Sequence, residues 1–370
     1  MPHDENEGLR HGLLSGGSLN VDGWTSIGGY GSPTYGLLAV SQGAQFTTEY
    51  LTIYPVSGHV IISGGSTVVT VNTQNSNAFQ QTGGISSLGA VSGNGSLSVG
   101  NPTGSSAYMT VTSISQQSVL IDSTGVVAIT GTNGSANSVN SLQINSGGLL
   151  NLGSSALTIN YGTGLSPNAV VAGYISSGYH NSAMPWTGTA GITSSSAASD
   201  PGHHSVAFAD GADGVVVNLP GVVSSAVPGG GVLPAGNELV TYAYAGDANL
   251  DGKVDFSDFV ILSNHYGGTF TNWDQGNFNY DSTVDFSDFV ILSNNFGEGV
   301  TGGNGSGATA LELARYNALA GSFGISQGQI AAWDATIASL PEPGCLLPLV
   351  IGVGVVMRRG RGRERGMGAD

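Results

Sequence analysis

Oxygen-bearing side chains recur at a fixed spacing in the stretch from Gly246 to Gly297. In its first half they occupy positions 1, 3, 5, 9 and 12 of a loop, as Asp247, Asn249, Asp251, Asp255 and Asp258. The backbone carbonyl of Lys253 stands at position 7, and Gly252 allows a sharp turn at position 6. Calcium is a hard cation that takes about 6 to 8 oxygen ligands, so this spacing predicts a calcium-binding loop.

A second loop repeats the pattern thirty residues later. Its oxygen donors are Asn277, Asn279, Asp281, the carbonyl of Thr283, Asp285 and Asp288. This loop has three carboxylates where the first has four, and Ser282 stands where the turn favours glycine. We therefore predict two calcium sites, of which the first is strong and the second weaker.

Each loop leads into a segment with helical periodicity. Residues Val254 to Asn264 recur without change from Val284 to Asn294. Apolar residues at i, i+3 and i+7 predict one buried face on each helix, namely Phe259, Leu262 and Tyr266, then Phe289, Leu292 and Phe296. Each helix also carries a second apolar strip: Val260 and Ile261, then Val290 and Ile291.

Two such loops, each followed by one helix, resemble a type I dockerin. The resemblance covers residues 246–298 and implies a small all-α calcium-binding unit. It also implies that the helices bind a cohesin-type protein, and the second apolar strip would then be the partner-binding surface.

Composition favours a β-rich protein for the rest of the chain. The 370 residues include 61 glycines and only 9% charged residues, while 40% of the residues are hydrophobic. The net charge is -16, and five of the eight basic residues lie between Arg358 and Arg365. Nucleic acid is therefore not an expected partner of the body of the chain. The single cysteine, Cys345, excludes a disulfide framework within the chain.

Residues 13–165 repeat a short theme of two apolar residues separated by one polar residue, followed by a Gly, Ser or Asn turn. Such alternation predicts short strands with one buried face. A parallel β-solenoid fits the small, interchangeable turns best, and a β-sandwich is the alternative. The segments VSGHVIISGGSTVVTV and INSGGLLNLGSSALTI resemble autotransporter-type β repeats.

Residues 166–245 are predicted to form an α+β connecting module. Ser166 and Pro167 suit the N-cap and first turn of a helix. His203 and His204 are adjacent, so they would point apart on a regular element, and we interpret them as part of a solvated loop. Residues 299–340 predict a Gly-rich linker followed by a helical hairpin.

The tail at 341–370 begins with Pro341, Glu342 and Pro343 and continues with an apolar run from Cys345 to Met357. Arg358 and Arg359 open an arginine cluster that follows this run. The order resembles the PEP-CTERM sorting signal, which implies recognition and cleavage by an exosortase-type enzyme. It also implies export to the cell envelope, with the apolar segment transiently in the membrane and the arginines cytoplasmic.

The first twelve residues are predicted to be unstructured and resemble no secretory signal. Because an exported protein needs such a signal, we expect the true start to lie upstream of Met1.

Three functional hypotheses follow. The first is a non-catalytic, calcium-stabilised surface or matrix protein. The second is a dockerin-bearing subunit of an assembly that binds or degrades an extracellular polysaccharide, which exposed aromatic residues on one solenoid face would favour. The third is a glycoside hydrolase or lyase, which a cleft with converging acids would favour. No Lys or Arg occurs between His11 and Gly252 and no catalytic motif is present, so we predict that the protein is not an enzyme.

Overall fold

Short strands dominate the first half of the chain and stack in parallel. The computed structural model describes residues 11–29, 35–131, 137–217, 231–269 and 272–299. Within them a parallel β-solenoid of about six turns covers residues 12–159. Its strands are β1 (His11–Ser15), β2 (Ser18–Ile27), β3 (Gly36–Ser41), β4 (Gln45–Ile53), β5 (Gly58–Asn75), β6 (Ala78–Ser92), β7 (Ser96–Val99), β8 (Ala107–Ile121), β9 (Gly125–Ile129), β10 (Asn137–Ile144), β11 (Leu149–Asn151) and β12 (Ala156–Asn160).

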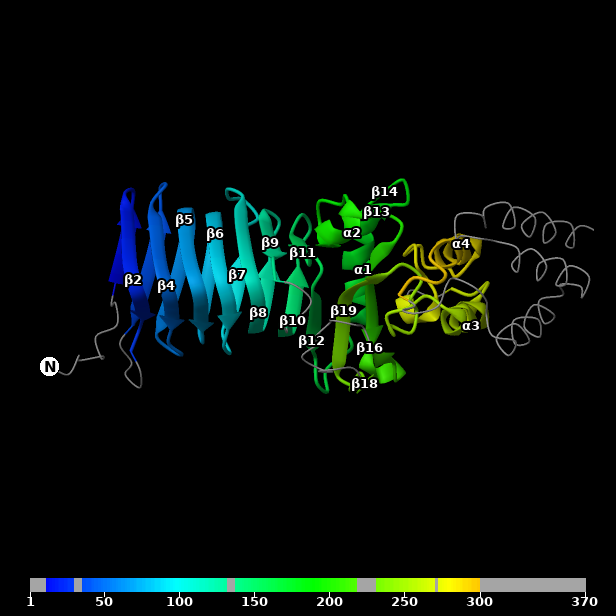
Figure 1. The fold of residues 1–370 in the computed structure, drawn as a ribbon. Helices are drawn as coiled ribbons and strands as arrows, with labels where there is room; N and C mark the ends of the chain where they lie inside the picture. Colours follow the sequence, from blue (N-terminus) through cyan, green and yellow to red (C-terminus); the bar gives the residue numbers. More distant parts are fainter. Residues whose placement is uncertain (1–10, 30–34, 132–136, 218–230, 270–271, 300–370) are drawn as a thin grey trace, which may run out of the picture.

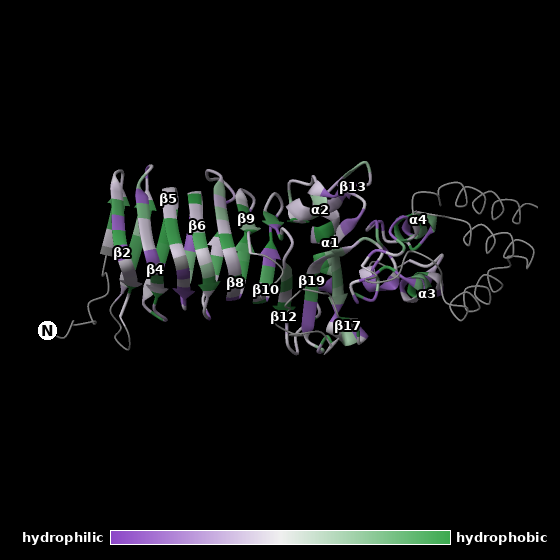
Figure 2. Ribbon diagram, viewed as in Figure 1, coloured by the Kyte–Doolittle hydropathy of each residue, from purple (hydrophilic) through white to green (hydrophobic). Residues whose placement is uncertain are grey.

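Equivalent positions of successive coils pair with one another, so their side chains form columns along the solenoid. One core column runs through Phe46, Thr67, Ser86, Met109, Val127 and Leu150, and the register partner of Phe46 in β2, Leu19, is 40% exposed. Because side chains alternate between the two faces of a strand, every second residue enters the core, as the pattern of buried residues in β3 and β4 shows. Figure 2 shows hydrophobic segments recurring on neighbouring strands of the stack. The predicted solenoid is therefore confirmed, and the sandwich alternative is not the fold of this region.

Several polar side chains enter the solenoid core, among them hydroxyls such as those of Thr67 and Ser86 and the amides of two hydrogen-bonded asparagines. Asn75 is fully buried and donates to the carbonyl of Ser96 at 2.9 Å and to Oε1 of Gln116 at 2.7 Å. Asn137 accepts from the backbone of Ile114 and donates to the carbonyl of Ala156, both at 2.9 Å. Such pairing removes the cost of burying an amide and ties successive coils together.

The connecting module closes the C-terminal end of the solenoid. Its elements are α1 (Asn168–Tyr179), β13 (His180–Asn181), β14 (Met184–Pro185), β15 (Gly191–Thr193), α2 (Ser195–Ser199), β16 (His204–Asp210), the 3-10 helix η1 (Gly211–Asp213), β17 (Val216–Val217), β18 (Gly231–Val232) and β19 (Asn237–Tyr244). Strand β15 extends the solenoid by pairing parallel with β11. Strand β19 pairs antiparallel with β12, and β16 pairs antiparallel with β19, so the parallel stack ends there.

Helix α1 begins one residue later than the sequence predicts. Its N-cap is Pro167 and its first residue is Asn168. The hydroxyl of Ser166 donates instead to the carboxylate of Asp210, while still accepting from the backbone N–H of Asn168 at 3.2 Å. Gly178 lies so close to the carbonyl of Ile192 that any Cβ there would collide with it, which lets α1 pack tightly on β15.

The two predicted loop and helix units follow, at the end of the molecule far from the first strands (Figure 1). They contain α3 (Phe256–His265), the 3-10 helix η2 (Trp273–Gln275) and α4 (Phe286–Asn294). Within the described ranges, no helix is both long and apolar enough to cross a membrane. The predicted helical hairpin and tail, from residue 300 onward, lie outside the described residues, as do the first ten residues.

Candidate metal-binding loops

Each of the two loops leads into a helix, and the two helices begin with the same local structure. Asp255 and Asp285 are N-caps with nearly equal backbone angles, φ -137 and ψ -163 against φ -136 and ψ -161. Each accepts a hydrogen bond from the N–H two residues on, and each forms a capping box with the Asp at the third helical position. The identical sequence from Val254 and from Val284 thus folds to the same local structure twice.

The position-12 carboxylates, Asp258 and Asp288, are fully buried and tie each helix back to its own loop. One oxygen of Asp258 accepts from the N–H groups of Ala248 and Asn249 at 2.8 and 3.1 Å, and the other from Asp255 at 2.8 Å. Asp288 repeats these contacts with the corresponding residues of the second loop.

The position-1 residues, Asp247 and Asn277, are also fully buried. The two carboxylate oxygens of Asp247 accept from the N–H groups of Asp251 and Gly252 at 3.1 and 2.9 Å. In the second loop, Asp281 is exposed, and one of its oxygens accepts from the N–H and the hydroxyl of Thr283. The first loop therefore encloses its carboxylates more fully than the second.

Both loops turn through the left-handed region at positions 4 and 6. Leu250 and Gly252 have φ of 56 and 82, and Tyr280 and Ser282 have φ of 61 and 73. Glycine adopts this conformation without strain, whereas a residue with a Cβ costs about 1 to 2 kcal/mol there. Leu250 and Tyr280 carry this cost at position 4 of each loop, and Ser282 adds it at position 6 of the second loop only.

Carboxylate charge is crowded in the first loop. Burial, followed by the charge of Asp258, raises the pKa of Asp247 to about 8. Burial raises the pKa of Asp258 to about 7 and that of Asp288 to about 6. Burial and then the charge of Asp255 also raise the pKa of Asp251, whereas at Asp281 hydrogen bonds from Thr283 outweigh burial and lower the pKa.

The carboxylates of both loops are turned toward backbone N–H groups rather than toward one centre. Across the described ranges, no three His, Cys, Asp or Glu side chains come close enough together to hold a metal ion. The donor set, with carboxylates, Asn side chains and the carbonyls of Lys253 and Thr283, is of the kind that calcium takes. Asp251 and Asp255 each accept the N–H two residues on with one carboxylate oxygen, from Lys253 and from Ser257.

The predicted partner strip is half-buried. Val260, Ile261, Val290 and Ile291 each keep intermediate exposure. Ile261 and Ile291 also pack partly against the core, together with Phe259 and Phe289. The sorting-motif residues Pro341, Glu342, Pro343, Arg358 and Arg359 lie outside the described residues.

An aromatic cluster joins the loops to the connecting module, and the sequence did not predict it. Tyr280, at position 4 of the second loop, contacts the rings of Tyr179, Trp186 and Trp273, with centroids 5.0, 5.7 and 5.8 Å away. Its hydroxyl donates to the carbonyl of Val206 at 2.8 Å. The indole of Trp273 donates to the carbonyl of Asp247 at 2.6 Å, so the cluster also holds the first loop.

A cleft of about 680 Å³ lies between the first loop, α3 and the connecting module. The acids Asp213, Asp251 and Asp274 line it, together with His265, Asn249 and Ile261. Burial, then the charges of Asp213 and Asp210, raise the pKa of Asp274 to about 7. The position-3 and position-5 residues of the first loop thus open onto an acidic cleft.

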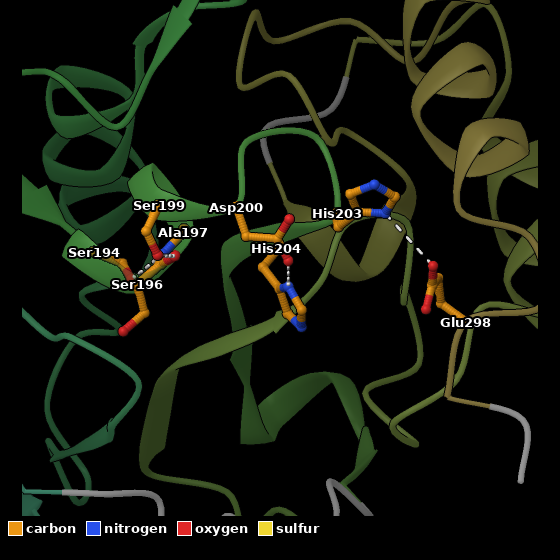
Figure 3. A network of polar contacts seen from close by, with 8 residues as sticks. All are labelled: Ser194, Ser196, Ala197, Ser199, Asp200, His203, His204 and Glu298. Atoms are coloured by element: carbon orange, nitrogen blue, oxygen red, sulfur yellow. Dashed lines mark hydrogen bonds and ion pairs between the residues drawn. The ribbon is translucent and has the colours of Figure 1, made fainter. Parts of the chain in front are cut away.

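The two histidines point away from each other, as Figure 3 shows. Nδ1 of His204 lies 2.8 Å from Oδ2 of Asp200, and its ring stacks on those of Tyr242 and Tyr244. Nδ1 of His203 lies 3.5 Å from Oε1 of Glu298, which follows α4. The prediction of a solvated loop is therefore wrong for His204, because β16 begins there and packs its ring, while His203 links the module to the end of the second unit.

The fold and the loops define a β-solenoid protein with a terminal pair of loop and helix units. No protein-family model, curated protein or solved structure matches the chain.

Proposed function

We propose that the protein is a non-catalytic, calcium-stabilised surface or matrix protein, exported to the cell envelope. The observation that carries the proposal is the first loop, in which Asp247 and Asp258 are buried and Lys253 is the one basic residue. Burial and then the charge of Asp258 raise the pKa of Asp247, and a bound divalent cation would offset that charge.

In this proposal Asp247, Asn249, Asp251, the carbonyl of Lys253, Asp255 and Asp258 hold the stronger calcium ion. Asn277, Asn279, Asp281, the carbonyl of Thr283, Asp285 and Asp288 hold the weaker one. Bound calcium supplies positive charge that fixes the loops, and the solenoid supplies extended surface. The half-exposed strip of Val260, Ile261, Val290 and Ile291 supports the further proposal of a cohesin-type partner, by the resemblance to dockerins.

Calcium titration tests this proposal. We expect Asp247→Ala to lower the affinity at least about tenfold, equivalent to about 1.4 kcal/mol, because it removes a buried charged ligand from the stronger loop. Asp281→Ala, in the weaker loop, should cost less. Calorimetry on the chelated protein measures both, with Glu49→Gln on the solenoid as a control that should bind as the parent does. A larger loss of calcium affinity in Asp281→Ala than in Asp247→Ala would contradict the assignment of the stronger loop. A protein that binds no calcium would refute the proposal.

The resemblance of the tail to a sorting signal supports the proposed location in the cell envelope. An exosortase-type enzyme would cut near Pro341 to Gly344, and the arginines from Arg358 onward would stop export. We expect the mature chain to end in that stretch, and replacement of the five arginines by serine to release uncut protein. Mass spectrometry of the native C-terminus measures this. Recovery of a mature chain that still carries Arg358 would show a membrane anchor in place of a sorting signal.

The alternative function is a dockerin-bearing subunit of a polysaccharide-binding or polysaccharide-degrading assembly. The observation that favours it is a stacked aromatic pair on the solenoid, formed by the exposed Trp24 and the half-buried Tyr50. The remaining alternative, a glycoside hydrolase or lyase, would place its acids in the cleft lined by Asp213 and Asp274.

A further inference from the structure

Two aromatic rings stack on the outside of the first two coils. Trp24 of β2 is the register partner of Tyr50 of β4. Their ring centroids lie 4.2 Å apart and their planes differ by 10°, although the Trp24 side chain is 68% exposed. Trp186 and Trp273, in contrast, are buried. We call Trp24 and Tyr50 the aromatic platform.

One face of the Trp24 ring is open. Strand β2 pairs with β4 and, in the described part of the chain, with no other strand. Tyr50 covers the indole from the β4 side, and no further strand of the described residues lies against the opposite face. A large exposed apolar ring is a common mark of a binding surface on a soluble protein.

Stacked bulges present the platform. The register shifts between Val21 and Trp24 in β2, between Thr48 and Tyr50 in β4, and between Val69 and Asn72 in β5. Bulges redirect side chains, and a bulge repeated at one place in successive coils marks a local surface feature. The solenoid therefore departs from regular pairing where the two rings emerge.

Carboxylates accompany the rings at the same bulges. Residues 13–161 contain three acids, Asp22, Glu49 and Asp122, and the first two lie within the bulges of β2 and β4. Both are exposed, and the amide of Asn20 donates to Oδ1 of Asp22 at 3.3 Å. Next to flat apolar rings, the surface thus offers acceptors for hydroxyl groups.

The negative charge of the chain restricts which kinds of ligand the platform can bind. No Lys or Arg occurs between His11 and Gly252, and the net charge is -16. Anionic polymers would be repelled. A neutral sugar ring has an apolar face of C–H groups and an edge of hydroxyls, which match an aromatic face flanked by carboxylates.

We propose that the platform of Trp24 and Tyr50 binds a neutral polysaccharide, with a sugar ring stacked on the open face of Trp24 and its hydroxyls donating to Asp22 and Glu49. The site is independent of the proposed calcium loops, which lie at the other end of the molecule (Figure 1).

Binding of soluble hexasaccharides tests the proposal. The full chain is titrated with cellohexaose, laminarihexaose and mannohexaose, with polygalacturonate as an anionic comparison, by calorimetry and by tryptophan fluorescence. We expect at least one neutral hexasaccharide to bind and polygalacturonate not to bind. Trp24→Ala and Tyr50→Ala should each weaken binding about tenfold or more, which corresponds to about 1.4 kcal/mol. Asp22→Asn and Glu49→Gln should weaken it less, and Tyr108→Ala, another exposed solenoid aromatic, should leave it unchanged.

Chelation of calcium should not alter this binding, so failure of the calcium proposal and failure of this one are distinguishable. Circular dichroism confirms that each variant is folded. The proposal is overturned by a panel in which no neutral hexasaccharide binds, or by binding that survives Trp24→Ala. A parent protein that is a dimer and becomes a monomer on Trp24→Ala, without sugar binding, would instead identify the platform as an interface between copies.

Discussion

Replacing Tyr280 by alanine is expected to lower the free energy of unfolding by about 3 to 5 kcal/mol, because the ring fills a buried aromatic cluster that would be left as a cavity. Tyr280 is only 8% exposed and contacts Tyr179, Trp186 and Trp273. Tyr179 and Trp186 belong to the connecting module, and Trp273 belongs to η2, which precedes the second loop. In the variant, the loop and helix units should therefore also unfold at a lower denaturant concentration than the solenoid.

Denaturant unfolding, followed by circular dichroism and by tryptophan fluorescence, measures both effects. Tyr280→Phe keeps the ring and loses the hydroxyl with its hydrogen bonds to Val206 and Ser205, so it should cost about 0.5 to 1.5 kcal/mol per hydrogen bond. Phe296→Ala removes an aromatic ring of the same unit that is 39% exposed, and should have little effect. If Tyr280→Ala were no more destabilising than Phe296→Ala, the cluster would not be what joins the two parts.

Replacing Glu238 by glutamine should remove a large dependence of stability on pH. Glu238 on β19 is fully buried opposite Asp210 of β16, and its Oε2 has no hydrogen-bond partner. Burial, followed by the charges of Asp210 and Asp274, raises its pKa from 4.5 to about 9, and Asp213 adds to this shift. The folded protein thus keeps a proton that the unfolded chain releases.

The sign follows from proton uptake. Between about pH 4.5 and pH 9 the folded state binds more protons than the unfolded state, so stability falls as the pH rises, and it levels off above the folded pKa. The loss across this window is on the order of 5 kcal/mol. Glu238→Gln carries no titrating group, so it should be close to the parent at pH 4.5 and clearly more stable at pH 9.

Unfolding free energies at a series of pH values measure this difference. Glu49→Gln, which changes an exposed glutamate on β4, should follow the parent curve. A Glu238→Gln protein that loses stability with pH as steeply as the parent would show that Glu238 is ionised when folded. Asp210 stays charged in this account, because hydrogen bonds from Ala212, Ser166 and Tyr161 outweigh its burial and lower its pKa.

Much of the fold follows from short-range sequence pattern. The alternation at Leu38 and Val40, or at Leu97 and Val99, assigns both members of each pair to the core, and all four are buried. Alternation alone does not distinguish parallel from antiparallel pairing, because the side-chain period is the same in both. The small turns favoured the solenoid, but the antiparallel pairing of β19 with β12 has no local signal.

In the helices of the loop units, too, sequence pattern predicts only part of the structure. The repeat predicted α3 and α4, and Leu262 and Leu292 are buried as expected. Tyr266 and Phe296, the last members of the two predicted faces, lie just beyond the helix ends. Helix α3 ends one residue after the repeat and α4 ends with it, because the C-terminal capping of each helix depends on contacts that periodicity does not describe.

Local spacing was enough to predict the repeated helix starts at Asp255 and Asp285 and the strand faces from Leu38 onward, because helix caps and strands are formed by neighbours in sequence. Only the tertiary structure decided that Tyr280 lies against Tyr179, that Glu238 is buried among acids, and that Trp24 stacks on Tyr50. These contacts join residues far apart in the chain. Their energies come from burial and from excluded water, which no local pattern records.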